Sequence, residues 1–285
     1  MNISVSEEKR TSPFIICKDH SVSGEKFELH YDKDYDMLLT KPIPERLDNY
    51  YKSDAYISHT DGKRNLLEFL YQLVKNVTIK KKLSYLDKYH PDKGMLLDIG
   101  AGTGDFLKNA GIKSWQIHGI EPSEDARKLA AKKGIFLNAD LSLSDTLKFD
   151  VITMWHVLEH VTNLREQVKV LKENLNSGGT IFIAVPNFKS NDATYYKEFW
   201  AAYDVPRHIW HFSQNSIRKI FDEHNMKVCE VIPMKFDAYY VSILSEKYKG
   251  SSLGYIKALY RGFISNWKAR RTNEYSSLIY VIKNA

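Results

Sequence analysis

The sequence is poor in cysteine, with only Cys17 and Cys229 among its 285 residues. Two isolated cysteines form neither a CxxC pair nor a disulfide framework, and they are too few for a structural zinc site. The chain also lacks an apolar run of the roughly 18 residues that a membrane span needs, and the segment MNISVSEEKR lacks the apolar stretch of a signal peptide. We therefore expect free thiols, no bound metal, no membrane span and a cytoplasmic location.

A large excess of charge of one sign is also missing, because 41 basic residues stand against 35 acidic ones. Two local basic runs occur, at Lys80–Lys82 and at Lys268–Arg271. Such runs are usually solvated faces of helices, so they support an anionic partner only weakly. We expect no nucleic-acid partner.

The first 90 residues predict a hairpin followed by a helical cap. Short apolar and aromatic runs, KFELHY and YDMLLT, stand on either side of Asp32–Asp34, which favours a small β-hairpin. Tyrosines gather between residues 45 and 56, and apolar residues recur at helical spacing from Arg64 to Tyr89. We therefore divide the chain into an N-terminal segment, 1–90, and a core, 91–285.

Strands and helices alternate in the core. The apolar runs predict strands at 95–99, 115–120, 135–138, 150–154, 180–185, 227–232 and 277–282, and an aromatic helical insertion at about 238–271. Alternation at this spacing predicts a mostly parallel sheet with helices on both faces, a Rossmann-like, doubly wound α/β fold.

A glycine-rich turn, DIGAGTG, lies between the first of these strands and a helix. Glycine permits a backbone with positive φ and lets a ligand approach closely, so we expect a nucleotide-like ligand over Gly100, Gly102 and Gly104. The alternative is a dinucleotide site of the GxGxxG type. That motif needs a glycine at position 105, which is Asp105 here, so the spacing argues against it.

The next predicted strand ends on Glu121. At the carboxyl edge of neighbouring parallel strands, a carboxylate can accept hydrogen bonds from both hydroxyls of a ribose. A glutamate at the end of a strand is often merely solvated, but its place beside the glycine turn favours a ligand role.

Four motifs follow one another in the chain: DIGAGTG, Glu121, Asp140 and the segment FDVITMWHVLEHV. Together they resemble the class I S-adenosylmethionine-dependent methyltransferases, especially the group with ubiquinone-biosynthesis, sugar and natural-product enzymes. The resemblance covers about Gly94 to Ile232 and the last strand. It implies S-adenosyl-L-methionine as the cofactor and a seven-stranded sheet whose last strand is reversed.

The same resemblance implies a set of cofactor contacts. The methionine part would lie near Asp98 and the glycines, the ribose at Glu121, and the adenine near Asp140 and Leu141. Trp155 and His156 would lie beside the cofactor, although Trp155 fits a plain core position equally well. The expected cofactor-binding residues are Asp98, Gly100, Ala101, Gly102, Gly104, Glu121, Pro122, Asp140, Leu141, Trp155 and His156.

A further segment, YDVPRHIWHFS, is similar to a P-x-H-x-x-x-F-S-like stretch that lines the acceptor pocket of related methyltransferases. Arg207 and His208 would then project over the sulfonium methyl group; alternatively, His208 and His211 cap the following helix. An imidazole can accept a proton at neutral pH, so the expected catalytic residues are His160, His208 and Arg207.

The N-terminal segment also looks like these relatives, many of which begin with a zinc-binding cysteine cluster. This chain keeps only Cys17 of such a cluster, so we expect no metal there. The segment YYKSDAYISH is a candidate cofactor cover. The residues expected to roof the acceptor pocket are Tyr51, Tyr56, Tyr239 and Tyr240.

These features predict transfer of a methyl group to an O, N or C atom of a small molecule by in-line displacement. One alternative is an RNA or protein methyltransferase, which only the basic runs support. Another is a cofactor-binding protein without catalysis, which the intact glycines and Glu121 disfavour. The acceptor and the oligomeric state do not follow from the sequence.

Overall fold

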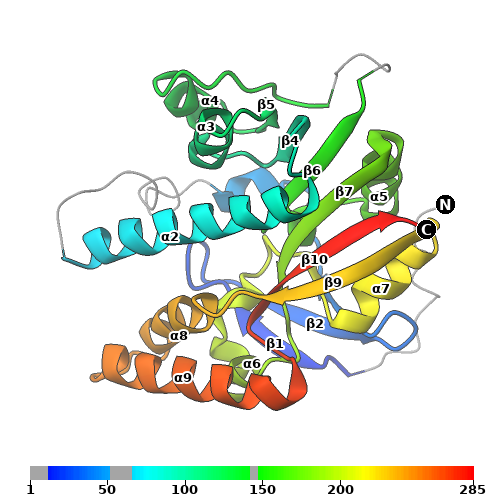
Figure 1. Ribbon diagram of the computed structural model, residues 1–285. Coiled ribbons are helices and arrows are strands. Elements are labelled where there is room, and N and C mark those ends of the chain that lie inside the picture. Colours follow the sequence, from blue (N-terminus) through cyan, green and yellow to red (C-terminus); the bar gives the residue numbers. More distant parts are fainter. Residues whose placement is uncertain (1–11, 52–65, 142–146) are drawn as a thin grey trace.

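The computed structural model describes residues 12–51, 66–141 and 147–285, and Tyr56 lies outside these ranges. Within them, the central sheet has six strands (Figure 1), in the order β5 (Gln116–Ile120), β4 (Met95–Ile99), β6 (Phe149–Trp155), β7 (Leu175–Pro186), β10 (Ser277–Asn284) and β9 (Met226–Pro233). The first four strands are parallel, and β10 runs antiparallel to both of its neighbours. The predicted α/β fold with a mostly parallel central sheet is confirmed.

Helices cover both faces of this sheet because its strands are apolar on both sides. Residues of α2 (Leu66–Tyr89), α3 (Asp105–Ile112) and α4 (Glu124–Ala131) share one apolar cluster with Leu96 and Val151. Residues of α5 (Leu164–Glu173) and α7 (Gln214–Asp222) share the other cluster with Leu97 and Ile152. Successive strand residues thus point to opposite layers, which is the arrangement that buried parallel strands require.

The prediction of a strand at 135–138 is wrong, so the sheet of the described residues has six strands instead of seven. This segment forms one isolated bridge, between Asn138 and Ile120, with hydrogen bonds from the Asn138 amide to Gly119 and from the Glu121 amide to Asn138. Phe136 is 86% exposed. Only the end of the segment therefore reaches β5, and no ladder extends from it.

The N-terminal strands form a second sheet together with a short strand from the core. The predicted hairpin is confirmed as β2 (Lys26–Asp32) and β3 (Met37–Lys41), and β1 (Ile15–Lys18) pairs with β2. On its other edge β3 pairs with β8 (Trp210–His211), and an aromatic cluster that includes Trp200 packs against this sheet. The N-terminal segment is thereby attached to the loop that carries His208.

The predicted helical insertion is confirmed as α8 (Asp237–Tyr248) and α9 (Gly254–Thr272), which lie beside α6 (Asn191–Tyr196) (Figure 1). The buried residues of α9 are small: Ala258, Gly262, Ser265 and Ala269. Its large apolar side chains face solvent. Among the described residues, no helix is both long and apolar enough to cross a bilayer.

A buried ion cluster around Arg207 ties the N-terminal strands to the loop that precedes β8. The Arg207 guanidinium, 1% exposed, donates hydrogen bonds to Asp204 at 2.6 and 3.0 Å, to Asp19 at 3.0 Å and to the carbonyl of Tyr50 at 3.0 Å. Asp19 follows β1, and Tyr50 belongs to the short helix η1 (Leu47–Tyr51). Burial alone would raise the pKa of both carboxyl groups. The amide of Ser23 together with the guanidinium holds the pKa of Asp19 below its usual range, and the guanidinium does the same for Asp204.

We predict that Arg207→Met, which removes the charge at similar volume, lowers the free energy of unfolding by about 3–5 kcal/mol because the buried Asp19 and the partly buried Asp204 lose their cation. Urea denaturation measures this. The control is Arg165→Met, whose exposed pair with Glu223 contributes about 1 kcal/mol or less. The lowered pKa values imply that the stabilisation is full above the unfolded aspartate pKa of about 3.9 and is lost as pH falls further. Equal losses in the two variants would contradict this account.

Candidate active site at the carboxyl ends of the parallel strands

One face of the glycine turn after β4 is closely packed against Val157, and the other face is open. The amides of Gly100 and Ala101 donate to the carbonyl of Ile120 at 2.8 and 2.9 Å, which fixes the turn against β5. A Cβ at Gly100 (φ +72°) would lie 2.4 Å from Val157, whereas a Cβ at Gly102 (φ +54°) would meet nothing within 4 Å. Gly104 (φ +76°) then starts α3. The backbone of the turn is therefore exposed to a ligand at Gly102.

The structure places Glu121 beside this turn. One carboxylate oxygen accepts a hydrogen bond from the amide of Gly102 at 2.9 Å, and the other accepts one from the amide of Ser123 at 2.9 Å. Arg127 donates to the carbonyl oxygens of Glu121 and Pro122 and so fixes the end of β5. The glutamate is thus held next to the open face of the turn.

Asp98 and Trp155 form the inner wall. The buried Asp98 accepts a hydrogen bond of 2.6 Å from Thr153, and its burial raises the pKa of its carboxyl group to about 7. The ring of Trp155 packs against Phe106 with centroids 5.4 Å apart, and among the described residues its buried indole Nε1 has no hydrogen-bond partner. Trp155 is therefore a partly buried residue packed against the core cluster, and its donor remains available.

Lys82 also belongs to this wall, although we expected it in a solvated basic run. Its Nζ lies 4.3 Å from the centroid of the Trp155 ring. Burial lowers the pKa of Lys82 to about 8, and the charges of Asp237 and Asp98 oppose that shift. Its helical spacing relative to the buried Ile79, Leu83 and Leu86 was the signal that could have revealed it.

His156 follows β6 with a positive φ of 59° and bridges two acidic residues. Its Nδ1 lies 3.4 Å from Glu159, and its Nε2 lies 3.2 Å from Asp237 at the start of α8. Burial alone would lower the pKa of His156, but these two carboxylates raise it to about 9. The imidazole therefore carries a positive charge at neutral pH. Asp237 was not foreseen, because it lies some 80 residues away in the insertion.

Asp140 and Leu141 follow the bridge at Asn138, next to the end of β5. Asp140 is exposed, and Leu141 is partly buried against the core cluster. These residues therefore lie on the same edge of the sheet as Glu121.

The structure brings His160 and His208 together as predicted, with ring centroids 4.6 Å apart. His160 ends the short helix η2 (Leu158–His160), and its Nδ1 lies 3.0 Å from the carbonyl of Arg207 and 3.0 Å from the hydroxyl of Tyr51. The Nδ1 of His208 lies 2.9 Å from the carbonyl of Ala202. The alternative in which the histidines cap the next helix is wrong, since Ser213 caps α7 and His211 contacts Thr40.

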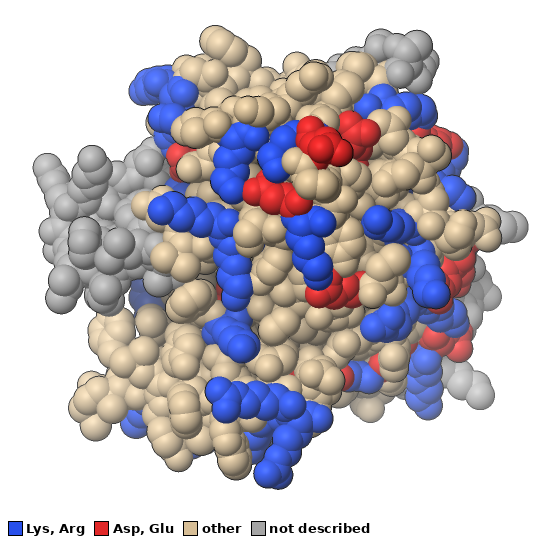
Figure 2. Space-filling view, viewed as in Figure 1, with Lys and Arg blue, Asp and Glu red and all other residues tan. Residues whose placement is uncertain are grey.

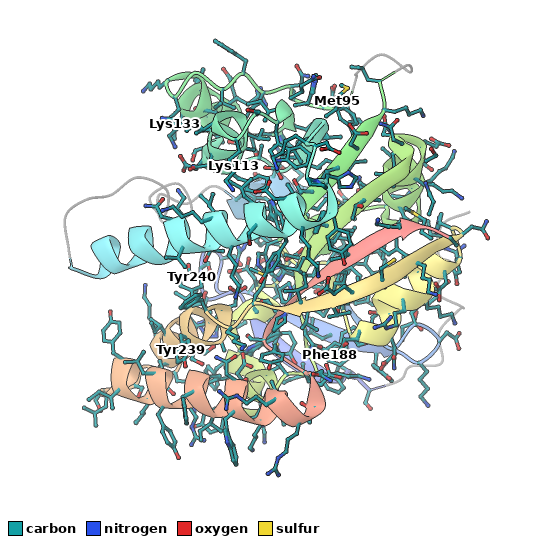
Figure 3. All side chains as sticks on the ribbon, in the orientation of Figure 1. Met95, Lys113, Lys133, Phe188, Tyr239 and Tyr240 are labelled. Atoms are coloured by element: carbon teal, nitrogen blue, oxygen red, sulfur yellow. The ribbon has the colours of Figure 1, made fainter. Side chains whose placement is uncertain are left out.

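The remaining expected site residues are more scattered. The guanidinium of Arg207 is held by Asp204, Asp19 and Tyr50, as described above. Figure 3 shows Tyr240 on the side of α8 toward α2 and Tyr239 on the side toward α9. A Cβ at Gly262 of α9 would lie 2.6 Å from Tyr239, so that ring packs between the two helices.

Comparisons with known proteins place the chain in a family. Residues 71–231, more than half of the chain, match the methyltransferase domain family. The chain is 35% identical over 102 residues to an uncharacterised protein of Methanocaldococcus jannaschii and 34% identical over 107 residues to an uncharacterised methyltransferase of Alkaliphilus oremlandii. These matches cover 34% and 35% of this chain, and 47% and 49% of those proteins. The chain thus spans about half the length of the curated relatives it matches.

Two solved structures resemble the whole fold. They are the magnesium protoporphyrin IX methyltransferase of Synechocystis PCC 6803 and the plantazolicin methyltransferase BpumL, both bound to S-adenosylhomocysteine. The TM-scores are 0.56 and 0.50 at 14% and 16% identity, over 85% and 84% of this chain and 100% and 93% of those chains. At such identities the likeness shows the fold alone. The chain therefore belongs to the methyltransferase domain family, and its fold is that of the class I S-adenosylmethionine-dependent methyltransferases.

Proposed function

We propose that this protein transfers a methyl group from S-adenosylmethionine to a small-molecule acceptor. The observation that carries the proposal is the glycine turn, open at Gly102, with a carboxylate on one side and a pair of histidines on the other. Val157 packs against Gly100, and the amide of His160 donates to the Val157 carbonyl at 3.0 Å. Val157 thus connects the packed face of the turn to the segment that carries His160, and through it to the histidine pair.

The residues at the turn fit the cofactor. The space above Gly102 is one that a side chain would fill, and the indole N–H of Trp155 is a buried donor without a partner in the described part of the chain. Asp98 and the glycines would hold the amino-acid part, Glu121 the ribose hydroxyls, and Asp140 with Leu141 the adenine end. When bound, the cofactor supplies a methyl group that its sulfonium activates for in-line displacement.

The chain's own contribution on the acceptor side is alignment and proton acceptance. The carbonyl of Ala202 can only accept, so the proton of His208 lies on Nδ1 and the lone pair on Nε2. That lone pair can take the acceptor's proton. Arg207 is a positioning residue, since its guanidinium is fixed in the ion cluster and its carbonyl orients His160. Tyr51 borders the same imidazole.

Small molecules fit this site better than nucleic acids do. Figure 2 shows Lys and Arg interspersed with Asp and Glu on the visible face, without a continuous basic groove. Lys82, from one of the two basic runs, points into the wall of the site and contacts Trp155. Lys82 therefore adds no support for RNA.

We predict that Glu121→Ala weakens the binding of S-adenosylhomocysteine by about 1.5–3 kcal/mol, the usual contribution of hydrogen bonds to a charged group. Isothermal titration calorimetry on the purified chain measures the affinity. Glu124→Ala is the matched control, because Glu124 is an exposed acid at the start of α4 that forms an ion pair with Lys128. Unchanged affinity in Glu121→Ala would show that Glu121 does not bind the ribose and is merely solvated.

We also predict that His208→Ala lowers turnover by about 10²–10⁴-fold while leaving cofactor affinity nearly unchanged. The assay follows label from methyl-labelled S-adenosylmethionine into a panel of small phenols, amines and carbon acids. An active acceptor found in the panel also tests the proposed function itself. Full turnover in His208→Ala would exclude His208 as the base.

A further inference from the structure

The outer face of α9 carries a row of exposed apolar side chains. Seven large apolar residues, from the residue before the helix to its last third, are each 49% to 68% exposed: Leu253, Tyr255, Ile256, Leu259, Tyr260, Phe263 and Trp267. We call these seven residues the apolar stripe. They recur at helical spacing and therefore share one side of α9. Exposed apolar surface of this extent marks an interaction site.

The inner face of α9 holds the helix on the protein without using the apolar stripe. Figure 1 shows α9 at the edge of the molecule, below α8 and α6. A Cβ at Gly262 would lie 2.6 Å from the ring of Tyr239, so α9 and α8 are in close contact there. The hydroxyl of Ser265 donates a hydrogen bond of 2.6 Å to the buried Asp192 of α6. The fold thus uses the small and polar residues of α9 and leaves the large apolar ones for a partner.

Basic side chains border the apolar stripe. Lys257, Arg261 and Lys268 are four and seven residues apart, so they lie along one flank of the helix. Arg270 and Arg271 add two more cations at its end, and residues 250–273 contain no acidic residue. Figure 2 shows blue side chains bordering tan surface in the lower part, where α8 and α9 lie. The surface around the stripe is therefore positively charged.

The acidic residues of the two neighbouring helices are buried or paired within the protein. Asp192 of α6 and Glu246 of α8 are 1% and 2% exposed, and Glu246 accepts a hydrogen bond of 3.1 Å from Tyr196. Asp237, at the start of α8, pairs with His156 at 3.2 Å. The acids of α6 and α8 therefore do not neutralise the cations of α9.

We infer that α9 lies on the surface of an anionic membrane. A helix of this kind lies in the plane of the interface, with its apolar face among the acyl chains and its Lys and Arg residues among anionic headgroups. Tyr255, Tyr260 and Trp267 are of the aromatic types that settle at the headgroup level. With five cations, α9 would lie on the bilayer and not cross it. The inference goes beyond the proposed function and does not depend on it.

A second copy of this chain and RNA each fit the surface less well. In a dimer formed through the apolar stripe, the cations of one copy would approach those of the other, and like charges repel. An RNA backbone would attract the same cations, but the aliphatic Ile256 and Leu259 offer it no hydrogen bond. A lipid surface matches both the charge and the apolar side chains.

The test is co-sedimentation of the full chain with phosphatidylcholine vesicles, with and without phosphatidylglycerol. The wild type should sediment with the anionic vesicles only, and about 1 M salt should lower the bound fraction because it screens the attraction. Ile256→Glu and Trp267→Glu should each lower the bound fraction at least several-fold. Ile112→Glu is the matched control, because Ile112, at the end of α3, is 75% exposed and Ile256 is 68% exposed.

A second pair of variants tests the charges separately. Lys257→Gln combined with Lys268→Gln should also lower binding to the anionic vesicles several-fold. Lys108→Gln combined with Lys132→Gln removes the same charge from exposed positions of α3 and the end of α4 and should retain most of the binding.

Circular dichroism and thermal midpoints show whether the variants are folded, and light scattering gives their oligomeric state. Absence of vesicle binding, equal binding to neutral vesicles, an equal loss in either control, or a dimer that Ile256→Glu dissociates would each refute the inference. Vesicle binding is measured without cofactor or acceptor, so its failure would leave the proposed methyl transfer untouched.

Discussion

The buried guanidinium of Arg207 is the constraint on which the acceptor side of this molecule depends. It joins Asp19 after the first strand, the carbonyl of Tyr50 and Asp204 of its own loop. The cation would not tolerate burial without the two carboxylates, and the buried Asp19 depends on the cation together with the amides of Ser21 and Ser23. The cluster therefore fixes the N-terminal sheet, the helix that carries Tyr51 and the loop that carries His208 in one arrangement.

The cofactor side depends on backbone bonds instead of charge. The amides of the glycine turn are bonded to Ile120 and Glu121, so the turn after β4 is set by the end of β5. Val157 lies under Gly100 and connects this turn to η2 and His160. A single packed contact thus couples the half of the site that would hold the cofactor with the half that would hold the acceptor.

Short-range patterns in the sequence predicted the parts of this site that lie next to one another in the chain. The glycine turn, Glu121 and the alternation of strands and helices were predicted because each depends on neighbouring residues and on a fixed period. The strand at 135–138 was overestimated because an apolar run does not say how many of its residues reach the neighbouring strand. Asn138 alone does so.

The sequence did not predict contacts between residues that are far apart in the chain. Lys82 was expected on a solvated face, yet its Nζ lies over the ring of Trp155. Asp237, which belongs to the insertion, pairs with His156. Arg207 was expected to face the methyl group, but two acids, one of them in the N-terminal segment, hold its guanidinium. Each depends on residues far apart in the chain, which no local period encodes.

The most direct measurement is a crystal structure of the chain with S-adenosylhomocysteine. The account predicts that both ribose hydroxyls bond to Glu121, that the homocysteine lies over Gly102, and that its sulfur faces the His160–His208 pair. A nucleoside bound elsewhere, or a sulfur that faces away from the two imidazoles, would contradict it.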